Sequence, residues 1–148
     1  MKKIAIAGCT GSIGVSSLEV IRQLGDDYRV TALSAHRNTD LLAQQLQYCS
    51  PETVVITDET ACKNFTPPSS FRGKILCGTE GLLQMAAEAD YDIFIGAMVG
   101  FAGLAPTVEA IKRGKRIALA NKETLVVAGE LITSLCAEYS AELLPVDS

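Results

Sequence analysis

The chain has 148 residues, enough for one ordinary domain with a buried core. Apolar residues make up 48% of it and charged residues 20%, a composition typical of soluble globular proteins. The formal net charge of −4 argues against a general affinity for nucleic acid or anionic membranes, and no stretch approaches the ~18 apolar residues of a membrane span.

Strands and helices are predicted to alternate along the whole chain. The first half predicts strands at 3–7, 30–35, 53–57 and 74–76, with helices at 13–23, 41–48 and 81–89. The second half predicts strands at 93–96, 116–120 and 143–146, with helices at 106–113 and 123–139. Asn38 or Thr39 is expected to cap the second helix, whereas residues 58–73 carry only a loop signal.

This alternation predicts an α/β fold. Strand–helix–strand crossovers give a Rossmann-like, doubly wound and mostly parallel sheet with helices on both faces. Ligands of such sheets bind outside the carboxyl ends of the strands, so the residues that follow each strand are the candidates for function.

The five cysteines form an odd set without a Cys-x-x-Cys pair: Cys9, Cys49, Cys62, Cys77 and Cys136. This pattern favours reduced thiols in a cytoplasmic protein over a disulfide framework or a zinc site. We therefore expect most of them to be small core side chains. The N-terminus enters a strand-like run at once, so no signal peptide is expected.

The segment IAIAGCTGSIG, residues 4–14, places Gly8, Gly11 and Gly14 between the first strand and the first helix. One glycine would permit the tight turn, one would let a pyrophosphate approach the backbone, and one would permit close helix–strand packing. Free N–H groups at the helix start favour bound phosphate. Because the spacing is G-x-x-G-x-x-G and not the dinucleotide fingerprint G-x-G-x-x-G, a turn that needs glycine only for packing is the alternative.

The end of the second strand, Ser34-Ala35-His36-Arg37-Asn38, lacks the carboxylate that binds the ribose 2′-hydroxyl in NAD sites. Arg37 offers a planar fork of donors suited to a phosphate, which predicts NADPH over NADH. His36, the only histidine, could carry charge beside that phosphate at lower pH. The alternatives are a solvated arginine and a surface or packing histidine.

The run RIALANKETLVVAG, residues 116–129, brings Asn121, Lys122 and Glu123 to the same edge at the start of a helix. A lysine at a helix N-terminus is electrostatically unfavourable, and an anionic or carbonyl-bearing ligand nearby would offset that cost. The alternative is that Lys122 pairs with Glu123 or points into water.

Four segments in this order resemble the N-terminal part of the 1-deoxy-D-xylulose 5-phosphate reductoisomerase family: GCTGSIG (8–14), AMVGFAGL (97–104), LANKETLVVAG (119–129) and LLPVDS (143–148). The resemblance covers essentially the whole chain. It implies an oxidoreductase and isomerase of non-mevalonate isoprenoid biosynthesis. This family rearranges and reduces 1-deoxy-D-xylulose 5-phosphate to 2-C-methyl-D-erythritol 4-phosphate, using NADPH and Mg²⁺ or Mn²⁺.

The resemblance also implies a role for each matching position. Residues that would hold the NADPH diphosphate are Thr10, Gly11, Ser12 and Ile13. The 2′-phosphate would meet Arg37 and Asn38 with His36 beside them, and the nicotinamide side of the cofactor would meet Asn121 and Glu123. The catalytic residue would be Lys122, which with Ser148 would contact the sugar phosphate substrate, and the metal ligand would be Asp147.

Two positions depart from the family pattern. His36 stands where glycine is usual, and Cys9 replaces the usual serine of the phosphate loop. Since Cys9 lies near a helix N-terminus, its thiol pKa is expected to fall, and its alkylation would then block cofactor binding.

Family members are considerably longer than this chain, with a catalytic region and a C-terminal domain. We therefore expect residues 1–148 to be the NADPH-binding domain, inactive alone because Asp147 is only one of the metal-binding carboxylates. The resemblance further implies a homodimer at full length and a cytoplasmic location. Two other interpretations stay open: another NADP-linked dehydrogenase domain, such as a homoserine or semialdehyde enzyme, and a non-enzymatic nucleotide-sensing module.

Overall fold

The computed structural model describes residues 1–120 and 122–146, without the side chains of residues 122–124 and 127. Within these residues, seven strands form one sheet in the order β4-β3-β2-β1-β5-β6-β7, and every neighbouring pair is parallel. The strands are β1 (Lys2–Ala7), β2 (Tyr28–Ala35), β3 (Thr53–Ile56), β4 (Lys74–Cys77), β5 (Ile93–Gly96), β6 (Arg116–Leu119) and β7 (Glu142–Pro145). The predicted α/β class and doubly wound sheet are confirmed.

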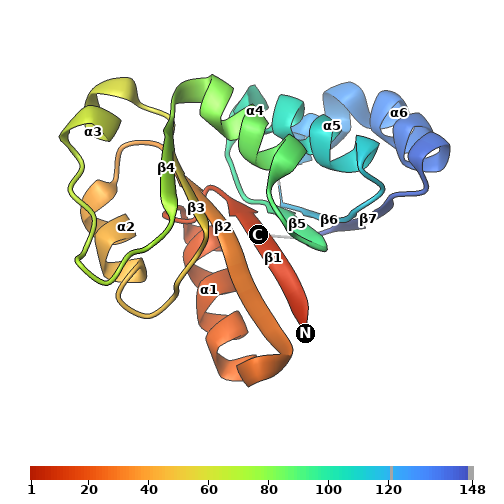
Figure 1. Cartoon of the computed structure of the whole chain (residues 1–148). Coiled ribbons are helices and arrows are strands. Elements are labelled where there is room, and N and C mark those ends of the chain that lie inside the picture. Colours follow the sequence, from red (N-terminus) through yellow and green to blue (C-terminus); the bar gives the residue numbers. More distant parts are fainter. Residues whose placement is uncertain (121, 147–148) are drawn as a thin grey trace.

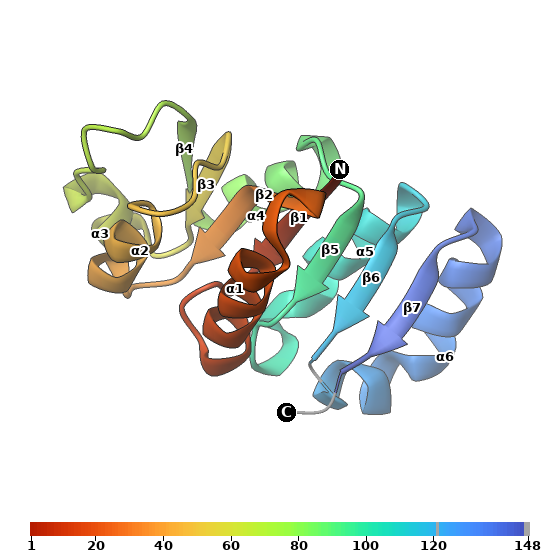
Figure 2. The same ribbon diagram turned by 90° about the horizontal axis from the view of Figure 1, so that it is seen from below.

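Helices cover both faces of the sheet (Figures 1 and 2). One face carries α1 (Ser12–Leu24), α2 (Thr39–Gln45) and α3 (Glu59–Asn64), and the other carries α4 (Gly78–Glu88), α5 (Leu104–Lys112) and α6 (Lys122–Tyr139). Two 3₁₀ turns complete the described elements, η1 (Gly25–Asp27) and η2 (Gly100–Gly103). None of the helices in the described part of the chain is long and apolar enough to cross a membrane.

The central strand β1 divides the core into two layers. Ile4 and Ile6 pack with α1, α2 and α3, whereas Ala5 and Ala7 pack on the face of α4, α5 and α6. This alternation follows from the two-residue period of a strand, whose successive side chains point to opposite faces. A strand that is apolar on both faces, as β1 is, belongs in the middle of a parallel sheet.

The strand order reverses beside β1. The chain builds β2, β3 and β4 outward on one side of β1 and then crosses to β5 on the other side, where Ala7 is paired with Gly96. Because all strands are parallel, their carboxyl ends share one edge of the sheet. The switch point between β1 and β5 at that edge is where such sheets bind ligands.

The structure adds one helix, in the segment 58–73, to those that the sequence predicts. Here the chain forms α3, which begins after Asp58, whose Oδ2 accepts the Ala61 N–H at 3.0 Å. A helix of six residues is too short to show an apolar period, so the sequence carries only a loop signal here. Asn38, and not Thr39, caps α2, because Asn38 Oδ1 accepts the Leu41 N–H at 3.2 Å.

The prediction of reduced thiols is wrong for two of the five cysteines. Cys62 on α3 and Cys77 at the end of β4 form a disulfide, with Cα atoms 5.8 Å apart. The unpredicted α3 packs beside β4, and that packing brings the pair into bridging range. Cys9, Cys49 and Cys136 are free; Cys9 and Cys136 are buried in the core, as expected.

Candidate functional site

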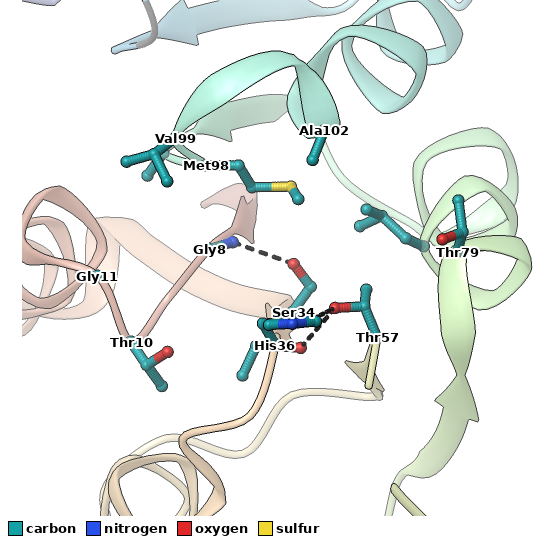
Figure 3. Close-up of a pocket in the computed structure, with 13 residues that line it drawn as sticks. Gly8, Thr10, Gly11, Ser34, His36, Thr57, Thr79, Met98, Val99 and Ala102 are labelled. Carbon is teal, nitrogen blue, oxygen red and sulfur yellow. Dashed lines mark hydrogen bonds between the residues drawn. The ribbon is translucent and has the colours of Figure 1, made fainter. Parts of the chain in front are cut away.

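A cavity of about 510 Å³ opens at the switch point, within the size range of small-molecule sites (Figure 3). Its walls come from five places in the chain: the β1–α1 loop, the end of β2, Thr57 after β3, the start of α4, and residues 97–102 after β5. Each of these segments follows a strand or begins a helix at the carboxyl edge. The described chain therefore has a cavity of suitable size at the edge where the sequence predicts the site.

The loop between β1 and α1 requires glycine at position 8. Gly8 has φ +88°, and a Cβ there would lie 2.9 Å from Ala97 O of the neighbouring strand end. The Gly8 N–H donates to both the carbonyl and the hydroxyl oxygen of Ser34, each at 3.0 Å. Figure 3 draws one of these two bonds. The turn is thus hydrogen-bonded to Ser34 of β2 on one side and packs closely against Ala97, the residue after β5, on the other.

The other two glycines of the loop differ in what surrounds them. A Cβ on Gly14 would lie 2.6 Å from Cys9 Cα, so only glycine lets α1 pack this closely on the loop. A Cβ on Gly11 would meet only Gly8 O and Ala97 O, at ordinary distances of 3.8 and 3.9 Å. The protein therefore does not itself require glycine at 11, and the missing side chain leaves backbone open on the cavity wall.

The start of α1 carries unpaired donors. No side chain caps this helix, whose N-cap is Gly11, and Val15 N–H donates to Gly11 O at 2.9 Å. The N–H groups of Thr10, Ser12 and Ile13 have no acceptor among the described residues. No acidic side chain lies in the first turn either. Free N–H groups at the positive end of a helix dipole bind anions, and phosphate above all.

Arg37 and Asn38 directly follow His36, which lines the cavity, and we call this segment at the end of β2 the rim. The Asn38 side-chain oxygen is occupied by the cap of α2, so its amide NH₂ is what remains for a ligand. The Arg37 side chain is 74% exposed, and its Nε donates to Asp58 Oδ1 at 3.3 Å. The terminal nitrogens of the guanidinium are left for a planar acceptor such as phosphate.

Asp58 is a carboxylate that the sequence analysis did not place here. The N–H of Ala61, followed by the guanidinium of Arg37, holds the pKa of the Asp58 carboxyl below its ordinary value. Asp58 is therefore ionised at neutral pH. Arg37 and Asp58 thus form an ion pair, and Arg37 is not an isolated cation.

His36 lines the cavity. Its Nδ1 and Thr57 Oγ1 share a hydrogen bond of 2.8 Å that links the ends of β2 and β3 (Figure 3). The pairing fixes the ring at the mouth of the cavity between the glycine loop and α4.

The cavity wall that faces the glycine loop is mostly apolar, and sequence reasoning missed it. It is formed by Leu82 of α4 together with Met98, Val99 and Ala102, and Figure 3 shows the last three above the glycine loop. The segment AMVGFAGL (97–104) carries part of the family resemblance, but the sequence predicts no role for it. Its position directly after β5, at the carboxyl edge, was the signal that could have placed it in the site.

The prediction for Cys9 is wrong. The residue is fully buried under α1, and burial raises the pKa of its thiol to about 12. Loss of solvation penalises the thiolate more than the nearby helix N-terminus stabilises it. Cys9 is therefore a core residue of the loop and not a reactive thiol.

Several predicted site residues lie outside the described part of the structure. These are Asn121, Asp147 and Ser148 entirely, and the side chains of Lys122 and Glu123. The backbone of Lys122 begins α6, three positions after Leu119, the last residue of β6. Across the residues that are described, no group of three His, Cys, Asp or Glu side chains could hold a metal ion.

Comparison with known proteins adds sequence evidence. The family model described as 1-deoxy-D-xylulose 5-phosphate reductoisomerase matches residues 4–129. The enzyme of that name from Chloroherpeton thalassium is 49% identical over 100% of this chain, which corresponds to 38% of the relative. The chain thus spans well under half the length of this curated relative.

Solved structures match in the same way. A 1-deoxy-D-xylulose 5-phosphate reductoisomerase from Zymomonas mobilis, in complex with NADPH, has a TM-score of 0.92 and 36% identity over 99% of this chain and 39% of its own. A second, in complex with magnesium, has a TM-score of 0.91 and 37% identity over 100% and 38%. A putative homoserine dehydrogenase from Archaeoglobus fulgidus, at 22% identity and a TM-score of 0.66 over 98% and 42%, shares the fold alone.

Proposed function

The chain belongs to the 1-deoxy-D-xylulose 5-phosphate reductoisomerase family, and from that premise we propose that residues 1–148 form its NADPH-binding domain. The whole protein then rearranges 1-deoxy-D-xylulose 5-phosphate and reduces the product to 2-C-methyl-D-erythritol 4-phosphate. The observation that carries this proposal is the set of N–H groups without a described acceptor at the start of α1, beside a cavity of about 510 Å³ that Thr10 and Gly11 line.

The glycine loop would hold the diphosphate of the cofactor. Thr10, Ser12 and Ile13 supply N–H donors without a described acceptor, and the open backbone at Gly11 lets the phosphates approach. Thr10 and Ser12 add hydroxyl groups. The positive end of the α1 dipole acts in the same direction.

The rim at the end of β2 would select the phosphorylated cofactor. Arg37 would present its terminal nitrogens, and Asn38 its amide NH₂, to the 2′-phosphate, with His36 beside them. The apolar wall that includes Leu82 and Met98 offers a surface for the adenosine moiety. NADPH, when bound, supplies the hydride for the reduction.

The catalytic end of the site rests on the resemblance. Lys122 would be catalytic and contact the sugar phosphate with Ser148, Asn121 and Glu123 would contact the nicotinamide side, and Asp147 would bind Mg²⁺ or Mn²⁺. One carboxylate does not fill the octahedral oxygen sphere of Mg²⁺. We therefore propose that the 148-residue chain alone binds metal weakly and turns over no substrate. A cytoplasmic homodimer with no affinity for nucleic acid is proposed for the whole protein.

Calorimetric titration with NADPH and NADH tests the cofactor assignment. We expect the chain to prefer NADPH, and Arg37→Ala to lose roughly tenfold or more in NADPH affinity while NADH affinity stays nearly unchanged. Arg72→Ala is the matched control, because Arg72 precedes β4 at the opposite edge of the sheet. Equal weakening for both cofactors would contradict the role of Arg37, and no heat with either would contradict the domain assignment.

Turnover is measured separately. Adding 1-deoxy-D-xylulose 5-phosphate, NADPH and Mg²⁺ to the purified chain should leave the NADPH absorbance unchanged. A steady, enzyme-dependent decrease would show that the residues proposed as one part of the site suffice for the reaction.

A further inference from the structure

A buried glutamine is tied to the glycine loop from behind. Gln45, the last residue of α2, is 1% exposed, and its Nε2 donates to the Cys9 carbonyl oxygen at 2.8 Å. Because a carbonyl oxygen can only accept, this contact fixes which end of the amide is the NH₂ group. Gln45 Oε1 is buried without a hydrogen-bond partner among the described residues.

An amide so placed is costly for the fold. Glutamine is seldom fully buried, and an unsatisfied buried acceptor loses its solvation without compensation. A methionine or leucine would fill the same space without that loss. Among the described residues, the gain that the structure shows for this side chain is its hydrogen bond to the loop.

The Cys9 carbonyl determines where the next N–H points. The peptide bond between Cys9 and Thr10 is planar and trans, so its C=O and N–H point in opposite directions. Holding the Cys9 oxygen toward the buried side of α2 therefore turns the Thr10 N–H away from α2. Thr10 lines the cavity, and its N–H is one of the donors without a described acceptor.

The same helix connects the rim with the support of the glycine loop. α2 begins after Asn38, which with Arg37 stands at the rim, and it ends at Gln45 under the loop. Gln45 also holds the chain beyond it, because its own carbonyl accepts the Cys49 thiol at 3.2 Å. The helix is thus a rigid link between the rim and the glycine loop.

We propose that Gln45 is a positioning residue for cofactor binding: through the Cys9 carbonyl it orients the Thr10 N–H toward the diphosphate. This inference rests on the proposed function. A merely structural glutamine would, on replacement, lower stability or weaken every contact to the cofactor alike. A positioning glutamine acts on the diphosphate and leaves the 2′-phosphate contacts in place.

The test compares Gln45→Met with Gln44→Met, an equivalent change at an exposed position on the same helix. Phosphorus NMR of bound NADPH resolves the diphosphate from the 2′-phosphate. For Gln45→Met we expect roughly tenfold weaker NADPH binding. The diphosphate resonances should move back toward their free positions at saturation, while the 2′-phosphate resonance keeps its bound position. Gln44→Met should match the wild type.

Other outcomes are equally decisive. Unchanged NADPH spectra and affinity for Gln45→Met, or a parallel change at all phosphates, overturn the proposal while leaving the proposed function intact. If the wild type binds no NADPH, the proposed function fails and this inference fails with it.

A second measurement covers the case in which Gln45→Met does not fold. In the ¹⁵N-labelled wild-type chain, the Thr10 amide resonance should shift downfield when NADPH is added, as expected for a new hydrogen bond to phosphate. A Thr10 amide that does not move on saturation overturns the proposal without any variant.

Discussion

Arg37 Nε donates a hydrogen bond to Asp58 Oδ1 at 3.3 Å, and this contact joins the end of β2 to the cap of α3. The carboxylate engages one edge of the guanidinium and leaves the terminal nitrogens free. It also places a negative charge beside the proposed site of the 2′-phosphate. Asp58 therefore orients the Arg37 guanidinium, and its negative charge would also repel the proposed 2′-phosphate.

Replacing Asp58 by Asn tests which of these two effects dominates. Asn keeps one oxygen for the Ala61 N–H that caps α3, but its NH₂ group cannot accept a hydrogen bond from Arg37 Nε, and the negative charge is lost. We expect NADPH to bind roughly two- to fivefold more tightly at low salt, with NADH unchanged. High salt should reduce the gain, because the rim is exposed to screening ions.

The control for this change is Asp27→Asn, in η1 and away from the cavity. Because the pKa of Asp58 is lowered, the carboxylate stays charged across the neutral range. The difference from wild type should therefore persist from neutral pH downward and vanish only below the ordinary carboxyl pKa. Weaker NADPH binding by Asp58→Asn would mean that the charge mainly holds Arg37 in place.

Gly8→Ala should be severely destabilising. Both the positive φ and the 2.9 Å approach to Ala97 O oppose a Cβ at this position. Gly25→Ala is a matched control, since Gly25 also has a positive φ, +76°, but a Cβ there would meet nothing within 4 Å. We expect a loss of about 1 kcal/mol for Gly25→Ala and about 3 kcal/mol for Gly8→Ala in urea unfolding. Equal losses would show that the contact with β5 is relaxed at no cost.

The Cys62–Cys77 disulfide should contribute to stability. It closes a loop with a sequence separation of 15, for which the entropy lost by the unfolded chain corresponds to about 3 kcal/mol. Reduction with dithiothreitol should lower the melting temperature by roughly 6–12 °C. The double variant Cys62→Ala/Cys77→Ala should start at the lower temperature and be insensitive to the reductant. An equal response of variant and wild type would argue against the bridge.

Alkylation counts the thiols directly. Iodoacetamide at pH 8 should label the folded protein slowly, because burial raises the pKa of Cys9 to about 12 and that of Cys49 to about 11. After denaturation without reductant we expect three labels, one for each free cysteine. Denaturation with reductant should add Cys62 and Cys77. Rapid labelling of Cys9 in the folded state, measured by peptide mass spectrometry, would restore the reactive-thiol hypothesis.

Burial of the Cys9 thiol should also make the fold sensitive to alkali. The folded-state pKa is raised, so the unfolded chain releases its proton at lower pH than the folded chain does. This stabilising contribution is complete below pH 9 and is lost as pH rises toward 12, at about 1.4 kcal/mol per unit. The unfolding free energy of Cys9→Ser should fall less than that of wild type between pH 8.5 and 10.5. Parallel curves would show that the thiol does not titrate with unfolding.

Much of this molecule could be predicted locally. The alternation of apolar strands with helices of 3.6-residue period identified the fold class, and Asn38 was correctly among the two residues expected to cap α2. The role of Gly14 was also accessible, because it depends on contacts with Gly8 and Cys9 in the same loop. For Gly8 the tight turn was accessible, but its close approach to Ala97 O, 89 residues away, was not. Short-range propensities and steric limits act within one turn or one strand, where the sequence is informative.

The contacts that define the site were not accessible in this way. Arg37 and Asp58 are 21 residues apart and Gln45 and Cys9 are 36 apart, and the six-residue α3 gave no period to reveal it. The sequence by itself determined the order of strands and helices and the edge at which a nucleotide would bind. Only the tertiary structure decided the pKa of Cys9, the Cys62–Cys77 pairing and the support behind Thr10. Ion pairs, the solvation of a thiol and a disulfide depend on which distant segments of the chain are in contact. Those contacts form only when the helices pack on the sheet.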